Sequence, residues 1–118
     1  MIAIKPNHLG TVMEVVVIGK ITKKNIEKFE REFKEKKEQH ERLNLVLFLT
    51  ELTGYSMQAI MEDLMFGARH LREFHKIAVF SDKKWMELST RISEYIPGVQ
   101  VRHFDFGKRE KALEWFEQ

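Results

Sequence analysis

Apolar residues in this chain gather in five short runs, and longer amphipathic segments stand between them. The run Leu43–Leu49 is interrupted only by Asn44, which is typical of a strand covered on both faces. Four further runs carry β-branched and aromatic residues and also predict strands. They are Ile2–Lys5, Thr11–Ile18, Lys76–Phe80 and Val99–Phe104.

Four amphipathic segments have the periodicity of helices that lie on a core. They are Lys23–His40, Met57–Phe74, Lys83–Tyr95 and Lys108–Phe116. In the first segment Ile26, Phe29 and Phe33 form one stripe, and Thr22 precedes it as the N-cap residue. The rest of this segment is lysine and glutamate, so we expect a solvated helix that contacts the core along a narrow face.

The three later segments place apolar residues at helical spacing as well. The predicted core positions are Ile60, Leu64, Leu71 and Phe74 in the second, Trp85, Leu88, Ile92 and Ile96 in the third, and Ala112, Leu113, Trp115 and Phe116 in the fourth. Ser81 or Asp82 can cap the third helix, and Pro97-Gly98 ends it.

The order of these elements is ββαβαβαβα, which predicts an α/β fold in a single domain over residues 1–118. The short link between the first two strands favours an antiparallel pair. Strands two to five are separated by helices, so they should run parallel with right-handed crossovers. We expect a five-stranded, mostly parallel sheet with four helices.

The amino-acid composition argues against several classes of function. The 118 residues hold 20 lysines and arginines against 18 aspartates and glutamates, a balance that gives little reason to expect nucleic-acid binding. Cysteine is absent, which excludes disulfides, thiolate metal sites and thiol nucleophiles. We see no signal peptide and no apolar run near the roughly 20 residues of a membrane span. These features lead us to expect a cytoplasmic protein, and the absence of cysteine is also compatible with a periplasmic one.

Several short runs resemble one known family. They are Thr53-Gly54-Tyr55, Glu62–Gly67, Phe74–Val79, Asp82–Trp85, Val101–Phe104 and Ala112–Trp115. Together they resemble the stage II sporulation protein AA-like family, within the STAS (sulfate transporter and anti-sigma-factor antagonist) superfamily. The resemblance covers nearly the whole chain and implies a β/α superhelical fold with successive parallel strands side by side. It also implies an architecture related to the lipid-binding CRAL-TRIO domains.

One position departs from the anti-sigma-factor antagonists of that superfamily. Their helix after the central strand begins with an Asp-Ser-Ser-Gly-Leu-type run whose serine is phosphorylated by a partner kinase. Here the same place reads Tyr55-Ser56-Met57-Gln58-Ala59, and Ser56 falls where the family's aspartate stands. The phosphoswitch therefore does not carry over, and we expect Ser56 to be a helix N-cap; phosphorylation is the alternative.

The junction after the central strand is the predicted binding site, because ligands and partners dock at the carboxyl ends of parallel strands. Gly54, Tyr55 and Ser56 form the strand-end loop. Met57, Met61 and Met65 follow in an i, i+4, i+8 row, and Phe66 stands beside them. Such a row suits a partner or an apolar ligand, and a wide core stripe filled with methionine explains it equally well.

Cations cluster near the end of the second predicted helix and at the start of the third. Arg69, His70, Arg72, His75 and Lys76 complement a negative helix terminus without any ligand, with anion binding as the minor option. Lys83 and Lys84 stand in a first turn, where cations are disfavoured. We expect Lys84 to reach a carboxylate or phosphate on a partner; extension into solvent is the alternative.

No pattern in the chain encodes a chemical reaction. The histidines His8, His40, His70, His75 and His103 show no metal-ligand spacing, and the six glycines build no phosphate-binding loop. No nucleophile stands with an identifiable base. We therefore expect no catalytic residue, no metal and no cofactor, and we do not expect an enzyme.

Three hypotheses about the function follow from these observations. The first is a non-catalytic interaction or regulatory module that docks a protein partner, or a second copy of itself as a homodimer, through the strand-end loop and the methionine row. The second is a small carrier for an apolar or lipid-like ligand, which the CRAL-TRIO likeness and the Met and Phe content favour. A third and weakest possibility is an enzyme with unrecognised groups. An enclosed apolar cavity of roughly 300 Å³ or more would favour the carrier.

Overall fold

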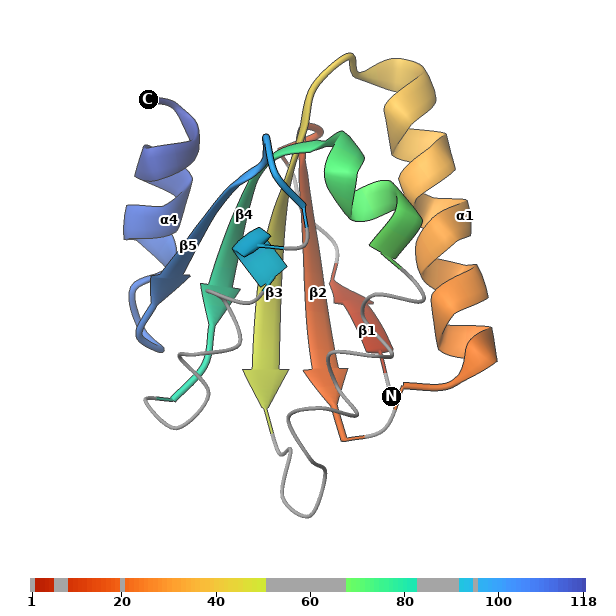
Figure 1. The fold of residues 1–118 in the computed structure, drawn as a ribbon, viewed down its shortest axis with the longest axis horizontal. Coiled ribbons are helices and arrows are strands. Elements are labelled where there is room, and N and C mark those ends of the chain that lie inside the picture. Colours follow the sequence, from red (N-terminus) through yellow and green to blue (C-terminus); the bar gives the residue numbers. More distant parts are fainter. Residues whose placement is uncertain (1, 6–8, 20, 51–67, 83–91, 95) are drawn as a thin grey trace.

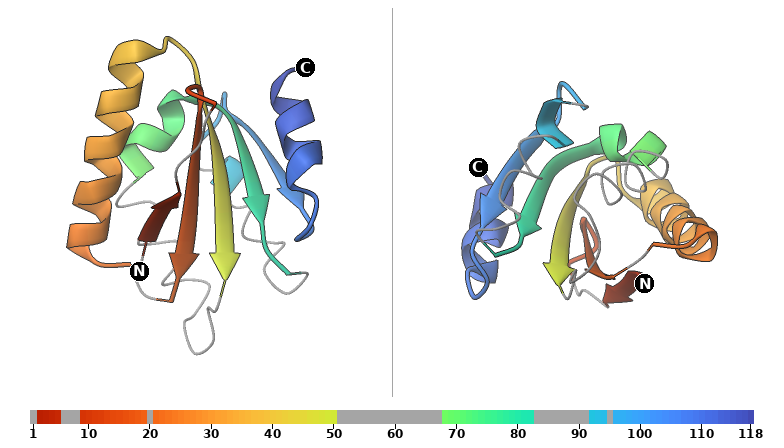
Figure 2. Two further views of the ribbon diagram at one scale, coloured as in Figure 1. Left: turned by 180° about the vertical axis from the view of Figure 1, so that it is seen from behind. Right: turned by 60° about the horizontal axis from the view of Figure 1, so that its bottom comes forward.

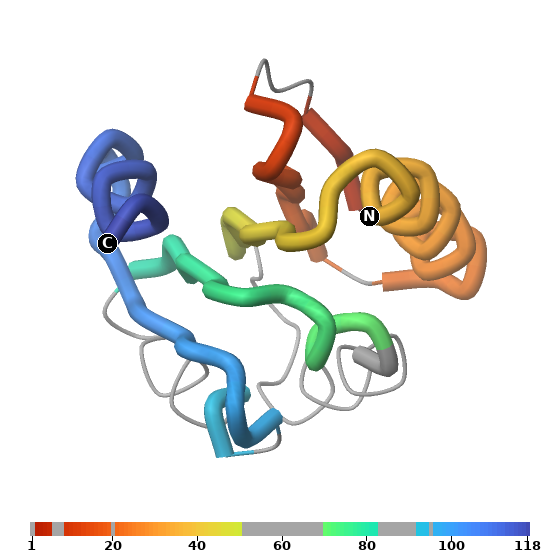
Figure 3. The backbone as a smooth tube through the Cα atoms, turned by 90° about the horizontal axis from the view of Figure 1, so that it is seen from above, coloured from red at the N-terminus to blue at the C-terminus, as the bar shows by residue number. Residues whose placement is uncertain are grey.

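The computed structural model describes residues 2–5, 9–19, 21–50, 68–82, 92–94 and 96–118 (Figure 1). A single five-stranded sheet forms the centre of the fold. The described helices lie on both sides of this sheet, with α1 and the short 3₁₀ helix η1 on one side and α4 on the other (Figures 1 and 3). This arrangement is a layered α/β architecture, as predicted.

The strands follow the chain order β1-β2-β3-β4-β5 across the sheet. Their bounds are Ile2–Lys5, Val12–Ile18, Leu43–Thr50, Phe74–Phe80 and Gln100–Phe104. β1 pairs with β2 in antiparallel fashion, and every later pair is parallel. The five strands, their directions and their side-by-side order are therefore confirmed.

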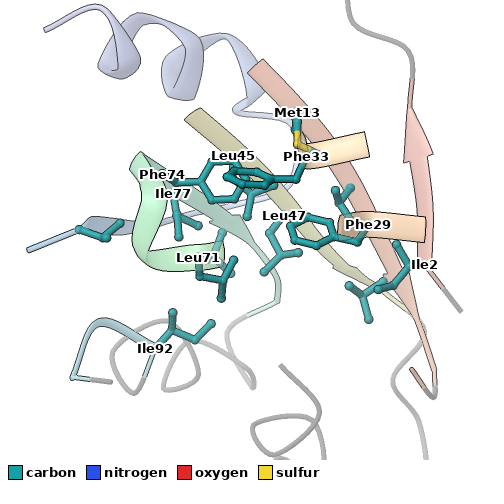
Figure 4. Close-up of a cluster of buried hydrophobic side chains, with 14 of the residues drawn as sticks. Ile2, Met13, Phe29, Phe33, Leu45, Leu47, Leu71, Phe74, Ile77 and Ile92 are labelled. Carbon is teal, nitrogen blue, oxygen red and sulfur yellow. The ribbon is translucent and has the colours of Figure 1, made fainter. Parts of the chain in front are cut away.

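Alternation along the strands divides the sheet into two faces. On one face Met13, Leu45 and Ile77 lie in register, and the main core forms there against α1 and η1 (Figure 4). On the other face Val46 and Phe80 belong to a second, smaller core that packs against α4. A strand buried on both faces needs apolar residues at nearly every position, which is the pattern that Leu43–Leu49 shows.

The helix α1 spans Lys23–Gln39. Thr22 is its N-cap, and the cap is reciprocal: Asn25 N–H donates to the Thr22 hydroxyl oxygen at 3.3 Å, and Thr22 N–H donates to Asn25 Oδ1 at 2.9 Å. Phe29 and Phe33 are buried, and both rings contact the ring of Phe74. The predicted cap and core stripe are confirmed, with Ile26 only partly buried.

The end of the second predicted helix differs from the expectation. Residues Ala68–Glu73 form the 3₁₀ helix η1, and β4 begins at Phe74, two residues before the predicted start of that strand. Leu71 and Phe74 are buried as predicted. Phe74 is in a strand because it pairs with Leu43 in the ladder and packs its ring between the two phenylalanines of α1. Prediction of a helix up to this residue was wrong.

The helix α4 spans Arg109–Phe116 and buries Ala112, Trp115 and Phe116, as predicted. The described residues thus contain α1, η1 and α4, together with a helical turn at 92–94, rather than four complete helices. Ile92 and Ile96 are buried, in agreement with their predicted core positions. Trp85 and Leu88, and most of the second predicted helix, lie outside the described residues. No helix of the described part is long and apolar enough to cross a membrane.

Candidate functional site

The residues predicted to bind a partner all lie outside the part of the chain that the structure describes. They are Gly54, Tyr55, Ser56, Met57, Met61, Met65, Phe66 and Lys84. The described strand β3 ends at Thr50, at the carboxyl edge of the parallel sheet, so the chain enters this segment from the edge where ligands and partners usually dock. The role of these eight residues stays a prediction.

A buried carboxylate joins the sheet to the start of α4. The side chain of Glu14, in β2, is only 3% exposed and lies against the guanidinium of Arg109. Arg109 Nε donates to Oε1 and Oε2 of Glu14 at 3.1 and 3.2 Å, and its Nη2 also donates to Oε1. The hydrogen bonds to Glu14 raise the pKa of Arg109 above its ordinary value, which favours the charged guanidinium. This pair holds α4 on the sheet.

A buried ammonium joins the sheet to the end of the same helix. Lys76, in β4, is 3% exposed, and its Nζ donates to the main-chain oxygens of Trp115 and Gln118 at 2.7 and 2.9 Å. The same ammonium lies 5.2 Å from the centre of the Trp115 ring, and Asn44 Oδ1 accepts the Lys76 N–H at 3.1 Å. The sequence had placed Lys76 in a cation cluster at the end of the preceding helix; its observed partner is the C-terminus of α4.

The two charges match the dipole of α4. A carboxylate lies at the helix start, where the backbone N–H groups leave partial positive charge, and an ammonium lies at the end, where the carbonyls leave partial negative charge. Sequence reasoning missed Glu14 and Asn44. Their signal is a polar residue inside an otherwise apolar strand, because such a residue must find a partner when it is buried.

Between these charged contacts, α4 packs on a row of aromatic rings. The rings of Phe48, Phe80 and Phe104 follow one another across β3, β4 and β5, with centroids 4.7 and 5.6 Å apart. Phe104 then contacts Trp115 at 5.8 Å, and Trp115 contacts Phe116 at 5.7 Å. Phe80 is fully buried, whereas Phe48, at the end of the row away from α4, is half-buried.

Beyond Phe48 the same sheet face has no described helix over it. Ala3, Val16, Phe48 and Thr50 are half-buried there, and we call these four residues the open face. The left view of Figure 2 shows the strands β2 and β3 in the middle of the sheet, with α4 to one side of them. Lys5 is exposed at its border and holds its Nζ 5.5 Å from the centre of the Phe48 ring.

Ser81 and His103 meet at the carboxyl ends of β4 and β5. His103 Nε2 lies 3.0 Å from both the main-chain oxygen and the hydroxyl oxygen of Ser81. A carbonyl oxygen only accepts, so Nε2 carries a proton and donates it. The Ser81 hydroxyl in turn donates to the Asp82 main-chain oxygen at 3.2 Å. A base that activates serine needs a free lone pair toward the hydroxyl, so this pair acts as a tether between strands.

Two histidines from the predicted cation cluster lie in different surroundings. His70, in η1, contacts the Glu73 carboxylate at 2.8 Å and the Glu30 carboxylate of α1 at 3.7 Å, so its charged neighbours are acids. His75, in β4, has a pKa lowered from the ordinary value by burial and by the positive charges of Arg42 and Lys76. His70, His75 and Lys76 therefore lie in three different surroundings.

The described residues contain no group of three metal-ligating side chains, and each of their buried side-chain nitrogen and oxygen atoms has a hydrogen-bond partner. The buried charged groups among them, Glu14 and Lys76, serve the packing of α4.

Comparison with known proteins identifies the family to which the chain belongs. No curated protein matches it. Among solved structures, an uncharacterised protein of the DUF3478 family from Shewanella loihica PV-4, with a SpoIIAA-like fold, superposes with a TM-score of 0.68. That match has 21% sequence identity and covers 98% of this chain and 91% of the other, so it shows the shared fold. The family profile described as SpoIIAA-like matches residues 12–117. The chain therefore belongs to the SpoIIAA-like family, within the STAS superfamily, as its short sequence runs indicated.

Proposed function

We propose that this chain is a non-catalytic interaction or regulatory module that binds a protein partner or a second copy of itself and lacks the phosphorylatable serine motif. The observation that carries the proposal is that the buried polar side chains of the sheet have partners within the fold, whereas part of its apolar surface is not fully covered. The buried polar side chains Glu14, Asn44 and Lys76 are engaged in contacts within the fold, while the open face beside α4 is only half-buried. Apolar surface left exposed by a domain marks an interaction site.

The strand-end loop and the methionine row remain the proposed main contact. Met57, Met61 and Met65 would present three adaptable apolar side chains after β3, and a twofold contact needs only one self-complementary surface. Membership of the STAS superfamily supports this reading, since its anti-sigma-factor antagonists act through protein partners. A homodimer in the cytoplasm is the simplest form of the proposal.

Analytical ultracentrifugation of wild type and Met61→Lys tests it. The charge would lie at the centre of the contact, where desolvation is costly, so the variant should be monomeric with an unchanged thermal melt. Gln58→Lys is the matched control, because it adds the same charge to the same predicted helix outside the row, and it should stay dimeric. A wild type that is monomeric at high concentration and binds no protein would refute the proposal, and loss of folding in Met61→Lys would show that Met61 is a core residue.

The carrier is the second candidate, favoured by the likeness to CRAL-TRIO domains and by the apolar surface around Phe48. A carrier would leave purification with a bound apolar molecule, whereas an interaction module would not. Mass measurement of the intact protein under native conditions separates the two.

A further inference from the structure

The face that carries α4 is only partly covered by described elements. α4 packs on Val46, Ala78, Phe80 and Phe104, which belong to β3, β4 and β5. The open face, formed by Ala3, Val16, Phe48 and Thr50, lies next to it over β1, β2 and β3. The apolar face of a sheet is usually buried against a second layer, and one more helix laid beside α4 would complete that layer.

We propose that the open face binds an acidic amphipathic helix of a partner protein, lying beside α4. This inference rests on the proposed function and adds a second contact surface to it, on the opposite side of the sheet from the main core. The helix would present apolar residues to Val16 and Phe48 and at least one carboxylate to Lys5.

The apolar half of the contact comes from the aromatic row. Phe48 stacks on Phe80 at 4.7 Å, so one side of its ring is fixed by the core, while the Lys5 ammonium lies 5.5 Å from the ring centre and the ring as a whole is only half-buried. Val16 is its register partner on β2 and Ala3 is the register partner of Val16 on β1, which places three apolar side chains in one line across the sheet. A fixed ring beside small and branched side chains is a ready site for apolar residues at i and i+4 of a helix.

The charges around the open face determine the partner's charge. Lys5 is exposed, and the Arg109 side chain is 40% exposed at the start of α4. Glu14 lies opposite Lys5 in the ladder, but its carboxylate is only 3% exposed and is neutralised by Arg109. Glu14 and Arg109 together are neutral, so the accessible charge of these three residues is that of Lys5, and a complementary group on the partner is a carboxylate.

The same charges disfavour a second copy of this chain as the occupant. A twofold contact across the open face would bring Lys5 of both copies to one interface without an accessible carboxylate among Lys5, Glu14 and Arg109 to pair with it, and like charges oppose such a contact. A sheet face that is open on one side also suits a helix better than a single lipid chain, which needs to be enclosed.

Two synthetic amphipathic helices of about 16 residues test the proposal, one with glutamates flanking a leucine stripe and one with lysines in the same places. Binding is measured by fluorescence anisotropy with the full chain. The acidic peptide should bind more tightly than the basic one. Phe48→Ser should weaken its binding about tenfold, because an aromatic anchor is removed. Lys5→Glu should weaken the acidic peptide about fivefold and strengthen the basic one.

Lys5→Glu keeps the test valid even where Phe48→Ser loosens the fold, because Lys5 is exposed. Lys34→Glu on α1 is the matched control and should change neither affinity, since Lys34 is exposed on a helix that packs on the opposite face. Equal binding of both peptides, no binding of the acidic peptide, or no effect of Lys5→Glu would overturn the proposal. So would a dimer that Phe48→Ser dissociates, or anionic vesicles that bind wild type and not Phe48→Ser. A dimer that only Met61→Lys dissociates, without acidic-peptide binding, would leave the proposed function standing and reject this inference alone.

Discussion

Removal of Arg109 tests how α4 is held on the sheet. Glu14 is 3% exposed and its carboxylate accepts three hydrogen bonds from Arg109. Breaking a fully buried ion pair on one side costs about 3–5 kcal/mol, because the remaining charge is left without compensation. The Arg109 side chain is 40% exposed, so water screens part of this interaction, and we expect about 2 kcal/mol for Arg109→Ala.

The double variant separates the cost of an orphaned charge from the net contribution of the pair. Replacing both partners, as in Glu14→Val with Arg109→Ala, removes the buried carboxylate together with its partner, so its stability should lie within about 1 kcal/mol of wild type. Urea unfolding measures both variants, and the single variant should also melt about 8 °C lower. Lys111→Ala, an exposed residue of the same helix, is the control and should change the free energy of unfolding by less than about 0.5 kcal/mol.

The reasoning fails if Arg109→Ala unfolds with wild-type free energy, because the pair would then contribute nothing to the docking of α4. It also fails if the double variant is no more stable than the single one, because the loss would then come from the side chain of Arg109 itself and not from the buried charge of Glu14.

Three further outcomes are expected. Thr22→Ala should lower the free energy of unfolding by about 1 kcal/mol, since it removes half of the reciprocal cap of α1, and a urea titration that shows no change would contradict the observed bonds. Ser56→Ala should cost about as much through loss of the predicted helix cap and should leave partner binding unchanged; stoichiometric phosphorylation of Ser56 by a cognate kinase would overturn the capping role. The pKa of His75 is lowered from 6.5, so the folded chain binds fewer protons than the unfolded chain just below that pH, and stability should fall as the pH drops through this window. His75→Gln should reduce that slope in thermal melts recorded across the window, and an unchanged slope would argue against the shift.

The strands could be predicted because the side chains that point to one face of the sheet recur at every second residue, and because the central strands are buried on both faces. Met13, Leu45 and Ile77 point to one core and Val46 and Phe80 to the other, so alternation and near-continuous apolarity both appear in the sequence. The parallel order followed from the helices between the strands, since a crossover is the only connection that returns the chain to the same edge.

The helix–strand boundary at Phe74 could not be predicted from local pattern. Leu71 and Phe74 are spaced as on a helix, and Phe74 is also two residues from Lys76, as on a strand. Long-range pairing with Leu43 decides between the two, and local periodicity does not contain that partner.

The polar contacts of α4 could not be predicted from the sequence for the same reason. Glu14 and Arg109 are 95 residues apart, and Lys76 is 39 residues from Trp115. Burial of a charged side chain can be suspected from its apolar neighbours, but its partner is determined by the packing of the whole domain. The predicted docking residues between Gly54 and Phe66, and Lys84, stay predictions for experiment.

Native mass spectrometry of freshly purified protein tests the central claim most directly, because it reports subunit number and retained ligands together. An interaction module should give a dimer, or a complex with another protein, whose mass is accounted for by polypeptide alone. A monomer that carries a small apolar molecule would contradict the proposed function and identify a carrier.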